Sequence, residues 1–284
     1  MTGILATTDE NKMLYAKHVK TSNQNDSLSQ IFNLIKPKST VLDIGCATGG
    51  LAKLLVKQKQ CKVFGLEQNP KSAAICQKAK IFTDITIFDV NKLTPTNFPL
   101  CKTKFDYVVC ADVLEHLQKP SQTIDLLQKF LKKDGKMIIS LPNVAHGSVK
   151  TNLLLNDFTY TEIGVLDKTH LHFYTYKSIA KLLSAHNLRI EQARAVYMPL
   201  DGWQPNKMSQ LPAEIARFIS QDKHSHIMQY IVLCAQSKAS VSHNISKLQD
   251  IPTKEQKNTI FWQIKRFLVN KHPCILKIIE KIRS

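Results

Sequence analysis

An acidic residue and two glycines follow the first short apolar run of the chain. Asp43 lies two positions before Gly45, and Gly49 follows in the same turn. A glycine at the end of a strand lets the backbone approach a ligand and turn into a helix N-terminus. Position 47 is alanine, so the dinucleotide fingerprint G-x-G-x-x-G is not met. The pattern predicts a ligand-binding turn of another kind.

Two histidines are candidates for proton transfer. His146 follows the apolar run 136–141, and His170 follows Asp167 in a polar segment. Imidazole titrates near neutrality and can take a proton from a hydroxyl. We predict His170 and His146 as candidate bases and Asp167 as the group that orients His170. In the alternative, each histidine only bonds a loop carbonyl. His172 would face the other way in an extended segment.

Metal binding is an open alternative at Asp112, Glu115 and His116, which share one face if this segment is a helix. These residue types also commonly begin helices, so we predict that no metal is bound there. His224 and His226 are a weaker pair because two ligands do not make a site. We predict a solvated loop around them.

Alternating apolar and amphipathic segments must position these residues. Strands are predicted at 40–45, 62–66, 85–88, 105–110, 136–141, 188–196 and 227–235, with a turn at Asp134-Gly135. Helices are predicted at 51–59, 71–80, 121–132 and 176–186, and in a first segment that starts at Ser27 and stops at Pro37. Such alternation of strands and helices indicates a mostly parallel sheet covered on both faces. The interval 198–226, with a short helix at 213–220, is predicted to cover the substrate.

The run Val41-Leu-Asp-Ile-Gly-Cys-Ala-Thr-Gly-Gly50 resembles motif I of the class I S-adenosylmethionine-dependent methyltransferases. The run from Phe105 to His116 resembles the fourth-strand motif of that family, and the whole resemblance covers roughly 27–235. It implies a Rossmann-like α/β fold with a seven-stranded, mostly parallel sheet, an antiparallel hairpin at its end and helices on both faces. It also implies S-adenosylmethionine as cofactor, held by Asp43, Gly45, Cys46, Ala47, Gly49, Glu67, Gln68, Asp89, Val90, Ala111 and Asp112.

A second resemblance concerns the acceptor. The segments 140–149, 152–155 and 164–173, with Phe158-x-Tyr160 between them, are similar to methyltransferases encoded among bacterial glycosyltransferases. Asp112, Glu115 and His116 more distantly resemble the metal cluster of ubiquinone-pathway O-methyltransferases. The similarity implies O-methylation of a sugar, a glycan, or a lipid-linked or other small-molecule acceptor. Because the acceptor attacks the methyl group directly, Cys46 is expected to fill space and not to act as a nucleophile.

The composition of the chain limits which other functions remain open. The chain has 284 residues, 43% of them hydrophobic, and a formal net charge of +17. No uncharged apolar run approaches the roughly 18 residues of a membrane span, so no transmembrane helix is expected. A secretory signal is not expected from the first residues either. The seven cysteines form no CxxC pair, which predicts reduced thiols in a cytoplasmic protein. The charge keeps a nucleic-acid methyltransferase or binder open, although no Asn-Pro-Pro-Tyr-type motif follows the fourth strand and nucleic acid is not the expected partner. A non-catalytic cofactor-binding protein or an NAD-dependent Rossmann protein also stays open.

The chain ends in a basic segment. We predict a polar lead at 1–26, a methyltransferase domain at 27–237, a linker at 238–258 and an amphipathic helical tail at 259–284. Four isoleucines of the tail form an i, i+3, i+4, i+7 stripe. The tail is predicted to contact an anionic membrane surface, which would place the protein at the inner face of the membrane, or a protein partner. The alternative is packing against the catalytic domain.

Overall fold

The structure is a computed structural model that describes residues 23, 25–94, 96–98, 100, 102–200, 207–238, 244–249 and 251. Most of the predicted lead and all of the predicted tail 259–284 lie outside these residues. The described strands are β1 (Thr40–Ile44), β2 (Lys62–Glu67), β3 (Asp84–Ile87), β4 (Phe105–Ala111), β5 (Leu131–Pro142), β6 (Leu188–Tyr197) and β7 (Ile227–Gln236). The described helices are α2 (Ser27–Leu34), α3 (Gly50–Lys59), α4 (Pro70–Ala79), α5 (Pro120–Gln128), α6 (Gly147–Leu154), α7 (Tyr176–Ala185), α8 (Ala213–Gln221) and α9 (Asn244–Gln249). None of these helices combines the length and the apolar character needed to span a bilayer.

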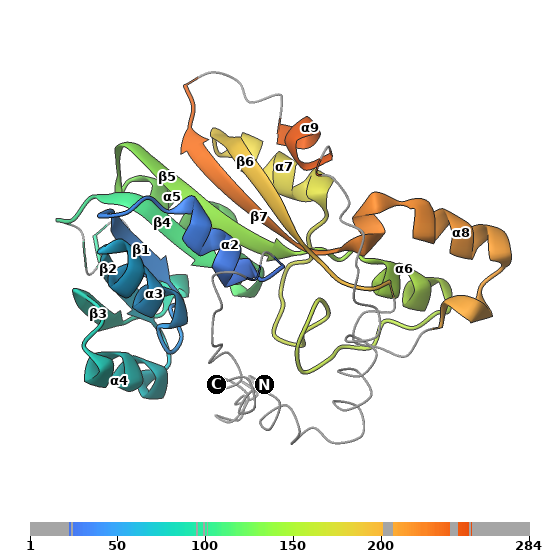
Figure 1. Ribbon diagram of the computed structural model, residues 1–284, viewed down its shortest axis with the longest axis horizontal. Helices are drawn as coiled ribbons and strands as arrows, with labels where there is room; N and C mark the ends of the chain where they lie inside the picture. Colours follow the sequence, from blue (N-terminus) through green and yellow to red (C-terminus); the bar gives the residue numbers. More distant parts are fainter. Residues whose placement is uncertain are drawn as a thin grey trace.

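The seven strands form one sheet in the order β3-β2-β1-β4-β5-β7-β6 (Figure 1). Strands β1 to β5 pair in parallel, and β7 lies antiparallel between β5 and β6. The chain moves outward from β1 to β2 and β3 and then returns to place β4 on the other side of β1. Open α/β sheets bind ligands at the carboxyl ends of the strands beside such a reversal. The predicted fold class is confirmed.

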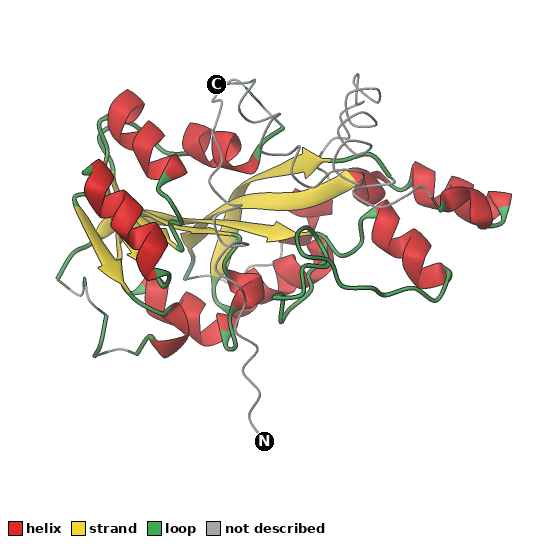
Figure 2. Cartoon of the chain, turned by 90° about the horizontal axis from the view of Figure 1, so that it is seen from below, coloured by secondary structure: helices red, strands yellow, loops and turns green. Residues whose placement is uncertain are grey.

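Helices lie on both faces of the sheet, as Figure 2 shows. One core packs α2 and α3 against the sheet through Ile31, Phe32, Leu51 and Leu55. The other packs α5, α7 and α9 against the opposite face through Ile124, Leu127, Ile179, Leu183 and Leu248. With both faces covered, the central strands carry the near-continuous apolar runs visible in the sequence.

Capping side chains fix where two of the helices begin. Asn69 accepts hydrogen bonds from the backbone N–H groups of Lys71 and Ser72, and Pro70 occupies the first turn of α4, where no backbone donor is needed. Thr175 and Ser178 form a reciprocal capping box at the start of α7. The cap at Asn69 starts α4 directly after β2, so the end of β2 has a fixed position at the edge of the sheet.

The boundary between α5 and β5 differs from the prediction. Helix α5 ends at Gln128 instead of 132, and the predicted turn Asp134-Gly135 lies inside β5. The register of β5 against β4 shifts there, so the additional residues form a bulge. Glycine suits this place because a Cβ on Gly135 would lie 2.7 Å from the carbonyl oxygen of Phe105. The turn residues therefore serve a close backbone approach within the strand.

The predicted linker 238–258 is wrong for 244–249 and 251, which belong to the fold. The side chain of Asn244 is buried; its Oδ1 accepts from the backbone N–H of Ile190 at 2.8 Å, and its Nδ2 donates to the carbonyl of Leu188 at 2.8 Å. Leu248 and Ile251 are buried in the core beside α7. Asn244 thus satisfies backbone groups of β6 that its edge position would leave unpaired, an effect that the polar composition of the segment conceals.

The predicted short helix of the interval 198–226 is confirmed as α8. Figure 1 shows α6 and α8 side by side in a lobe at the end of the molecule opposite β3, and residues of the two helices are in contact. Residues 201–206 of the interval lie outside the described part. The long segment between α6 and α7 returns from this lobe to the carboxyl ends of the strands.

Candidate active site

A cavity of about 440 Å³ lies at the carboxyl ends of β1, β2, β3 and β4. All of the predicted cofactor residues except Gly49 line it, namely Asp43, Gly45, Cys46, Ala47, Glu67, Gln68, Asp89, Val90, Ala111 and Asp112. We term this part the strand side. The other part, termed the loop side, is lined by His116, Glu162, Asp167, Lys168 and Thr169. The two sides come from sequence segments that the fold alone brings together.

Glu67 ends β2 on the strand side, with both carboxylate oxygens held by backbone donors. Oε2 accepts from the N–H of Ala47 at 2.8 Å, and Oε1 accepts from the N–H of Asn69 at 2.7 Å. A carboxylate oxygen can accept more than one hydrogen bond, so both oxygens keep capacity for hydroxyl donors. The carboxylate is therefore oriented before any ligand arrives.

Asp43 is buried near Glu67. Burial, with the neighbouring charge of Glu67 as the smaller cause, raises the pKa of Asp43 to about 7. A cation placed beside this carboxyl group would favour its ionised form. The strand side is thus suited to a ligand with a positively charged group near Asp43.

Gly49 does not line the cavity but makes the turn before α3 possible. Its φ is 77°, in the left-handed region that favours glycine. A Cβ at this position would meet side-chain atoms of Ile81 and Phe82 at 2.9 Å. The residue is needed for close packing and backbone shape, and its neighbours carry the contact with the cavity.

Asp112 follows β4 with a φ of 55°, an uncommon conformation for a residue with a side chain. Its Oδ1 accepts from Ser140 Oγ at 3.1 Å and also from Nε2 of Gln229. Ser140 lies on β5 and Gln229 on β7, so two neighbouring strands hold this turn at the cavity wall. Sequence reasoning missed Gln229 because nothing local indicates that β7 pairs with β5.

The predicted helix face of Asp112, Glu115 and His116 is not formed. Leu114–His116 is a short 3₁₀ helix, and Asp112 lies before it with its carboxylate turned toward β5 and β7. Glu115 and His116 meet His170 instead, with one ligand atom from each of the three residues within 4.8 Å of the others. The backbone N–H of Leu171 donates to the carbonyl of Glu115 at 2.8 Å and fixes this part of the loop.

Glu115 is a buried carboxyl group, and its Oε2 has no hydrogen-bond partner in the described part of the chain. Burial, with a smaller contribution from the charge of Asp112, raises the pKa of Glu115 well above its usual value. An unpaired buried polar atom costs roughly 1–3 kcal/mol. A carboxyl group left in this state beside two imidazoles is suited to receive a proton or a cation.

The two imidazoles of this cluster have the same tautomer. Nδ1 of His116 faces the carbonyl oxygen of Thr169 at 3.2 Å, and Nδ1 of His170 faces that of Val165 at 3.1 Å. A carbonyl can only accept, so each Nδ1 carries the hydrogen and each Nε2 keeps its lone pair. Burial, and to a lesser extent the neighbouring His116, lowers the pKa of His170. His170 is therefore neutral at physiological pH, in the form that accepts a proton or ligates a metal.

The charge of Asp167 raises the pKa of His170 as a smaller effect than burial, in the predicted direction, and Asp167 also shapes the backbone of the loop. Its Oδ1 accepts from the backbone N–H of Thr169 at 2.8 Å and from the hydroxyl of Thr169 at 2.7 Å. Asp167 lines the cavity while its backbone carbonyl accepts from the N–H of His170 at 3.0 Å. It thus shapes the turn that carries His170.

His146, the other candidate base, does not line the cavity. It is 1% exposed and caps α6, accepting from the backbone N–H of Ser148 through Nδ1 at 3.2 Å. Its Nε2 then donates to the carbonyl of Met198 at 3.4 Å. Burial lowers the pKa of His146 to about 4. Both ring nitrogens serve the packing of α6, which matches the structural alternative that the sequence left open.

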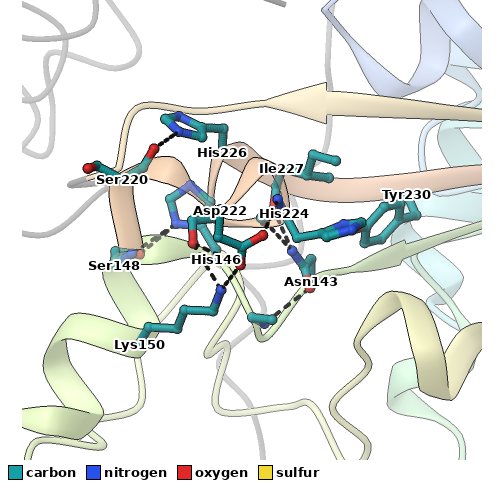
Figure 3. A network of polar contacts seen from close by, with 12 residues as sticks. Asn143, His146, Ser148, Lys150, Ser220, Asp222, His224, His226, Ile227 and Tyr230 are labelled. Atoms are coloured by element: carbon teal, nitrogen blue, oxygen red, sulfur yellow. Dashed lines mark hydrogen bonds and ion pairs between the residues drawn. The ribbon is translucent and has the colours of Figure 1, made fainter. Parts of the chain in front are cut away.

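His146 is part of a polar network that joins α6 to the start of β7 (Figure 3). Lys150 of α6 forms an ion pair with Asp222, and Nδ2 of Asn143 donates to the carbonyls of His224 and Ile227 at 2.9 and 2.8 Å. The prediction of a solvated loop around His224 and His226 is wrong. His224 is buried, with Nδ1 2.6 Å from the hydroxyl of Tyr230.

Comparison with known proteins places this geometry in a family. The family model described as "Methyltransferase domain" matches residues 15–193. The mitochondrial ubiquinone biosynthesis O-methyltransferase of Dictyostelium discoideum is 29% identical over 170 residues, which cover 56% of this chain and 53% of that protein. The ubiquinone biosynthesis O-methyltransferase of Haemophilus ducreyi is 30% identical over 122 residues, covering 39% and 51%. The chain thus spans about half the length of these curated relatives.

Solved structures show the same fold. The O-methyltransferase of a trans-AT polyketide synthase multienzyme from Brevibacillus brevis, in complex with S-adenosyl-L-homocysteine, has a TM-score of 0.53 at 17% identity, covering 85% of this chain and 82% of that one. A putative methyltransferase from Bacillus halodurans has a TM-score of 0.52 at 13% identity, covering 75% and 99%. The family match extends over well more than half of the chain and agrees with the seven-stranded sheet. The chain belongs to the class I S-adenosylmethionine-dependent methyltransferases.

Proposed function

We propose that the chain transfers a methyl group from S-adenosylmethionine to a hydroxyl of a sugar, a glycan, or a lipid-linked or other small-molecule acceptor. The observation that carries this proposal is a cavity in which carboxylates at the strand ends adjoin the cluster of Glu115, His116 and His170. The curated relatives are O-methyltransferases by name, which supports oxygen as the methylated atom.

The strand side fits the cofactor in size and in chemistry. The whole cavity, at about 440 Å³, lies in the range of about 300–1,000 Å³ typical of small-molecule sites. Asp43 would pair with the ammonium group, Glu67 with the two ribose hydroxyls and Asp89 with the adenine amino group. When bound, the cofactor supplies a methyl carbon activated by the neighbouring positive sulfur. The protein's main task is then to align the acceptor with that carbon.

A hydroxyl acceptor must also lose its proton, and His170 is the proposed base. The tautomer set by the carbonyl of Val165 leaves Nε2 with a lone pair, and although His170 does not itself line the cavity, its ring lies 4.7 Å from that of His116, which does. The lowered pKa keeps this nitrogen unprotonated at neutral pH, so it can take the proton as the oxygen attacks. Thr169 and Asp167 hold the loop in register, and the charge of Asp167 makes His170 more basic than burial alone would leave it.

The same cluster also fits a divalent cation. One carboxylate oxygen and two imidazole nitrogens are a donor set that suits Zn²⁺ and related metals. Both imidazoles donate their other ring N–H to a backbone carbonyl, the usual outer contact of metal-bound histidines. A cation here would lower the pKa of a coordinated hydroxyl. Metal content therefore distinguishes a cation site from His170 acting alone.

Calorimetry with S-adenosylhomocysteine and with NAD tests the cofactor. We expect binding of the first and none of the second; the reverse result would favour an NAD-dependent protein. Transfer of a radiolabelled methyl group to glycan, lipid and nucleic-acid fractions then tests the acceptor. Label in nucleic acid, with binding that weakens steeply with salt, would contradict the proposal. Membrane or partner contact through 259–284 stays a prediction, because those residues lie outside the described part.

A further inference from the structure

Three aromatic side chains extend the loop side of the cavity onto the protein surface. We term Phe158, Tyr160 and Phe173 the aromatic platform. The ring centroid of Phe158 lies 5.7 Å from that of Tyr160 and 5.9 Å from that of Phe173. Phe173 lies 6.2 Å from His170, whose ring lies 4.7 Å from that of His116 at the cavity wall. The rings thus form a continuous series from the cavity to the surface.

The outer rings of this series are open to solvent. Phe158 is 42% exposed and Tyr160 is 51% exposed, while Phe173 is half-buried between them and the cavity. Single exposed apolar residues are ordinary on protein surfaces. Exposed rings that touch one another and continue a candidate active site are more informative, because contiguous apolar patches mark binding sites.

The polar groups around the aromatic platform are hydroxyls and paired charges. The Thr159 hydroxyl donates to Asp157 at 2.6 Å, and Lys207 forms an ion pair with the same carboxylate at 2.6 Å. Lys168 pairs with Glu162 at 2.6 Å. Each of these two lysines is thus paired with a carboxylate, so the two pairs add no net positive charge for a polyanion or an anionic membrane to bind.

We propose that the aromatic platform binds a pyranose ring of a neutral saccharide acceptor. The apolar C–H face of a sugar ring can lie on an aromatic face while its hydroxyls stay in water or bond to hydroxyls such as that of Tyr160. A prenyl acceptor would leave much of its apolar surface in water on these half-exposed rings, whereas a pyranose needs only one apolar face covered. The inference rests on the proposed function, because the platform serves the acceptor of that reaction.

The test uses the full chain saturated with S-adenosylhomocysteine and four probes: the methyl pyranosides of glucose, mannose, rhamnose and N-acetylglucosamine. Saturation-transfer difference NMR should show magnetisation reaching the ring C–H protons of one or more of them. Phe158→Ala and Tyr160→Ala should each weaken that binding about two- to tenfold, the effect of losing one aromatic contact. Phe218→Ala is the matched control, because Phe218 is 71% exposed on α8; it should bind as the wild type does.

Calorimetry with S-adenosylhomocysteine and thermal unfolding accompany each variant and should be unchanged. A wild type that binds S-adenosylhomocysteine but none of the four pyranosides would overturn the inference and leave the cofactor proposal intact. A double Phe158→Ala, Tyr160→Ala variant that binds pyranosides as tightly as the wild type would also overturn it. Binding of catechol that depends on Phe158, without any pyranoside binding, would identify an aromatic acceptor instead. A wild type that fails to bind S-adenosylhomocysteine would overturn the proposed function itself.

Discussion

The two sides of the cavity differ in how their polar groups are satisfied. On the strand side, both oxygens of Glu67 already accept backbone hydrogen bonds, and Asp112 is held by Ser140 and Gln229. Next to the loop side, in the short 3₁₀ helix after β4, Oε2 of the buried Glu115 has no partner in the described part of the chain. The acceptor groups at the strand ends are therefore oriented by hydrogen bonds before a ligand binds. The reactive carboxyl group next to the loop side is left without a hydrogen-bond partner.

The largest effect is expected from His170→Ala on the loop side. Loss of a general base typically slows a reaction about a hundredfold or more, so kcat should fall by that factor. The Kd for S-adenosylhomocysteine should stay unchanged because the strand side is intact. His172→Ala is the control on the same loop and should keep the wild-type rate. Wild-type turnover by His170→Ala would place the base elsewhere.

A cation at the loop side should stabilise the fold. If Glu115, His116 and His170 hold a cation, so that His170 is not a free base, chelator-treated protein incubated with Zn²⁺ or Mn²⁺ should retain the ion after dialysis, as measured by elemental analysis, and unfold at a higher temperature. At about one hundred times its Kd a ligand contributes roughly 2.7 kcal/mol. Glu115→Gln keeps the shape of the side chain but should lose this gain. If no ion is retained, His170 acts without a metal.

On the strand side, Glu67→Ala should weaken binding of S-adenosylhomocysteine about tenfold or more. Two hydrogen bonds of roughly 1 kcal/mol each are removed, and the turn at Ala47 loses its acceptor. Glu67→Gln keeps one acceptor oxygen and should show a smaller loss, and Glu214→Ala, an exposed acid on α8 that does not line the cavity, should show none. Calorimetry measures all three, and unchanged affinity in Glu67→Ala would remove the ribose assignment.

The pH dependence of cofactor binding tests the role of Asp43 on the strand side. The raised pKa of Asp43, about 7, means that the free protein protonates this group as the pH falls below 7. A ligand whose ammonium group pairs with Asp43 binds the ionised form better, so affinity for S-adenosylhomocysteine should fall up to about tenfold per pH unit below 7. Above 7 it should level off. Asp43→Asn should bind weakly at every pH, and a wild-type affinity that is flat between pH 5 and 8 would contradict this role.

The smallest effect on rate is expected from His146→Ala. Loss of the α6 cap and of the contact with Met198 should lower the free energy of unfolding by about 1–2 kcal/mol, measured by denaturant titration. The turnover of folded molecules should stay at the wild-type value, and His146→Asn should recover part of the stability. A hundredfold loss of kcat in His146→Ala would reverse the assignment of the two histidines.

The sequence by itself determined the strand side. Asp43, Glu67, Asp89 and Asp112 each lie within a residue or two of the end of an apolar run, and parallel strands bring such ends to one edge of the sheet. Their positions thus follow from local pattern and strand direction alone. The alternation of elements gave the fold class for the same reason. The errors at α5 and at 244–251 arose where a long-range contact, at Gly135 and at Asn244, overrode local composition.

Only the tertiary structure decided the loop side. The sequence placed His116 and His170 in separate segments and favoured His170 over His146 only slightly, because Asp167 precedes it. The carbonyls of Val165 and Thr169 set the tautomers of His170 and of His116, which lines the cavity, and the carbonyl of Met198 engages His146 away from it. Such contacts join residues far apart in the chain or on irregular backbone, where neither the period of a helix nor that of a strand constrains which side chains meet.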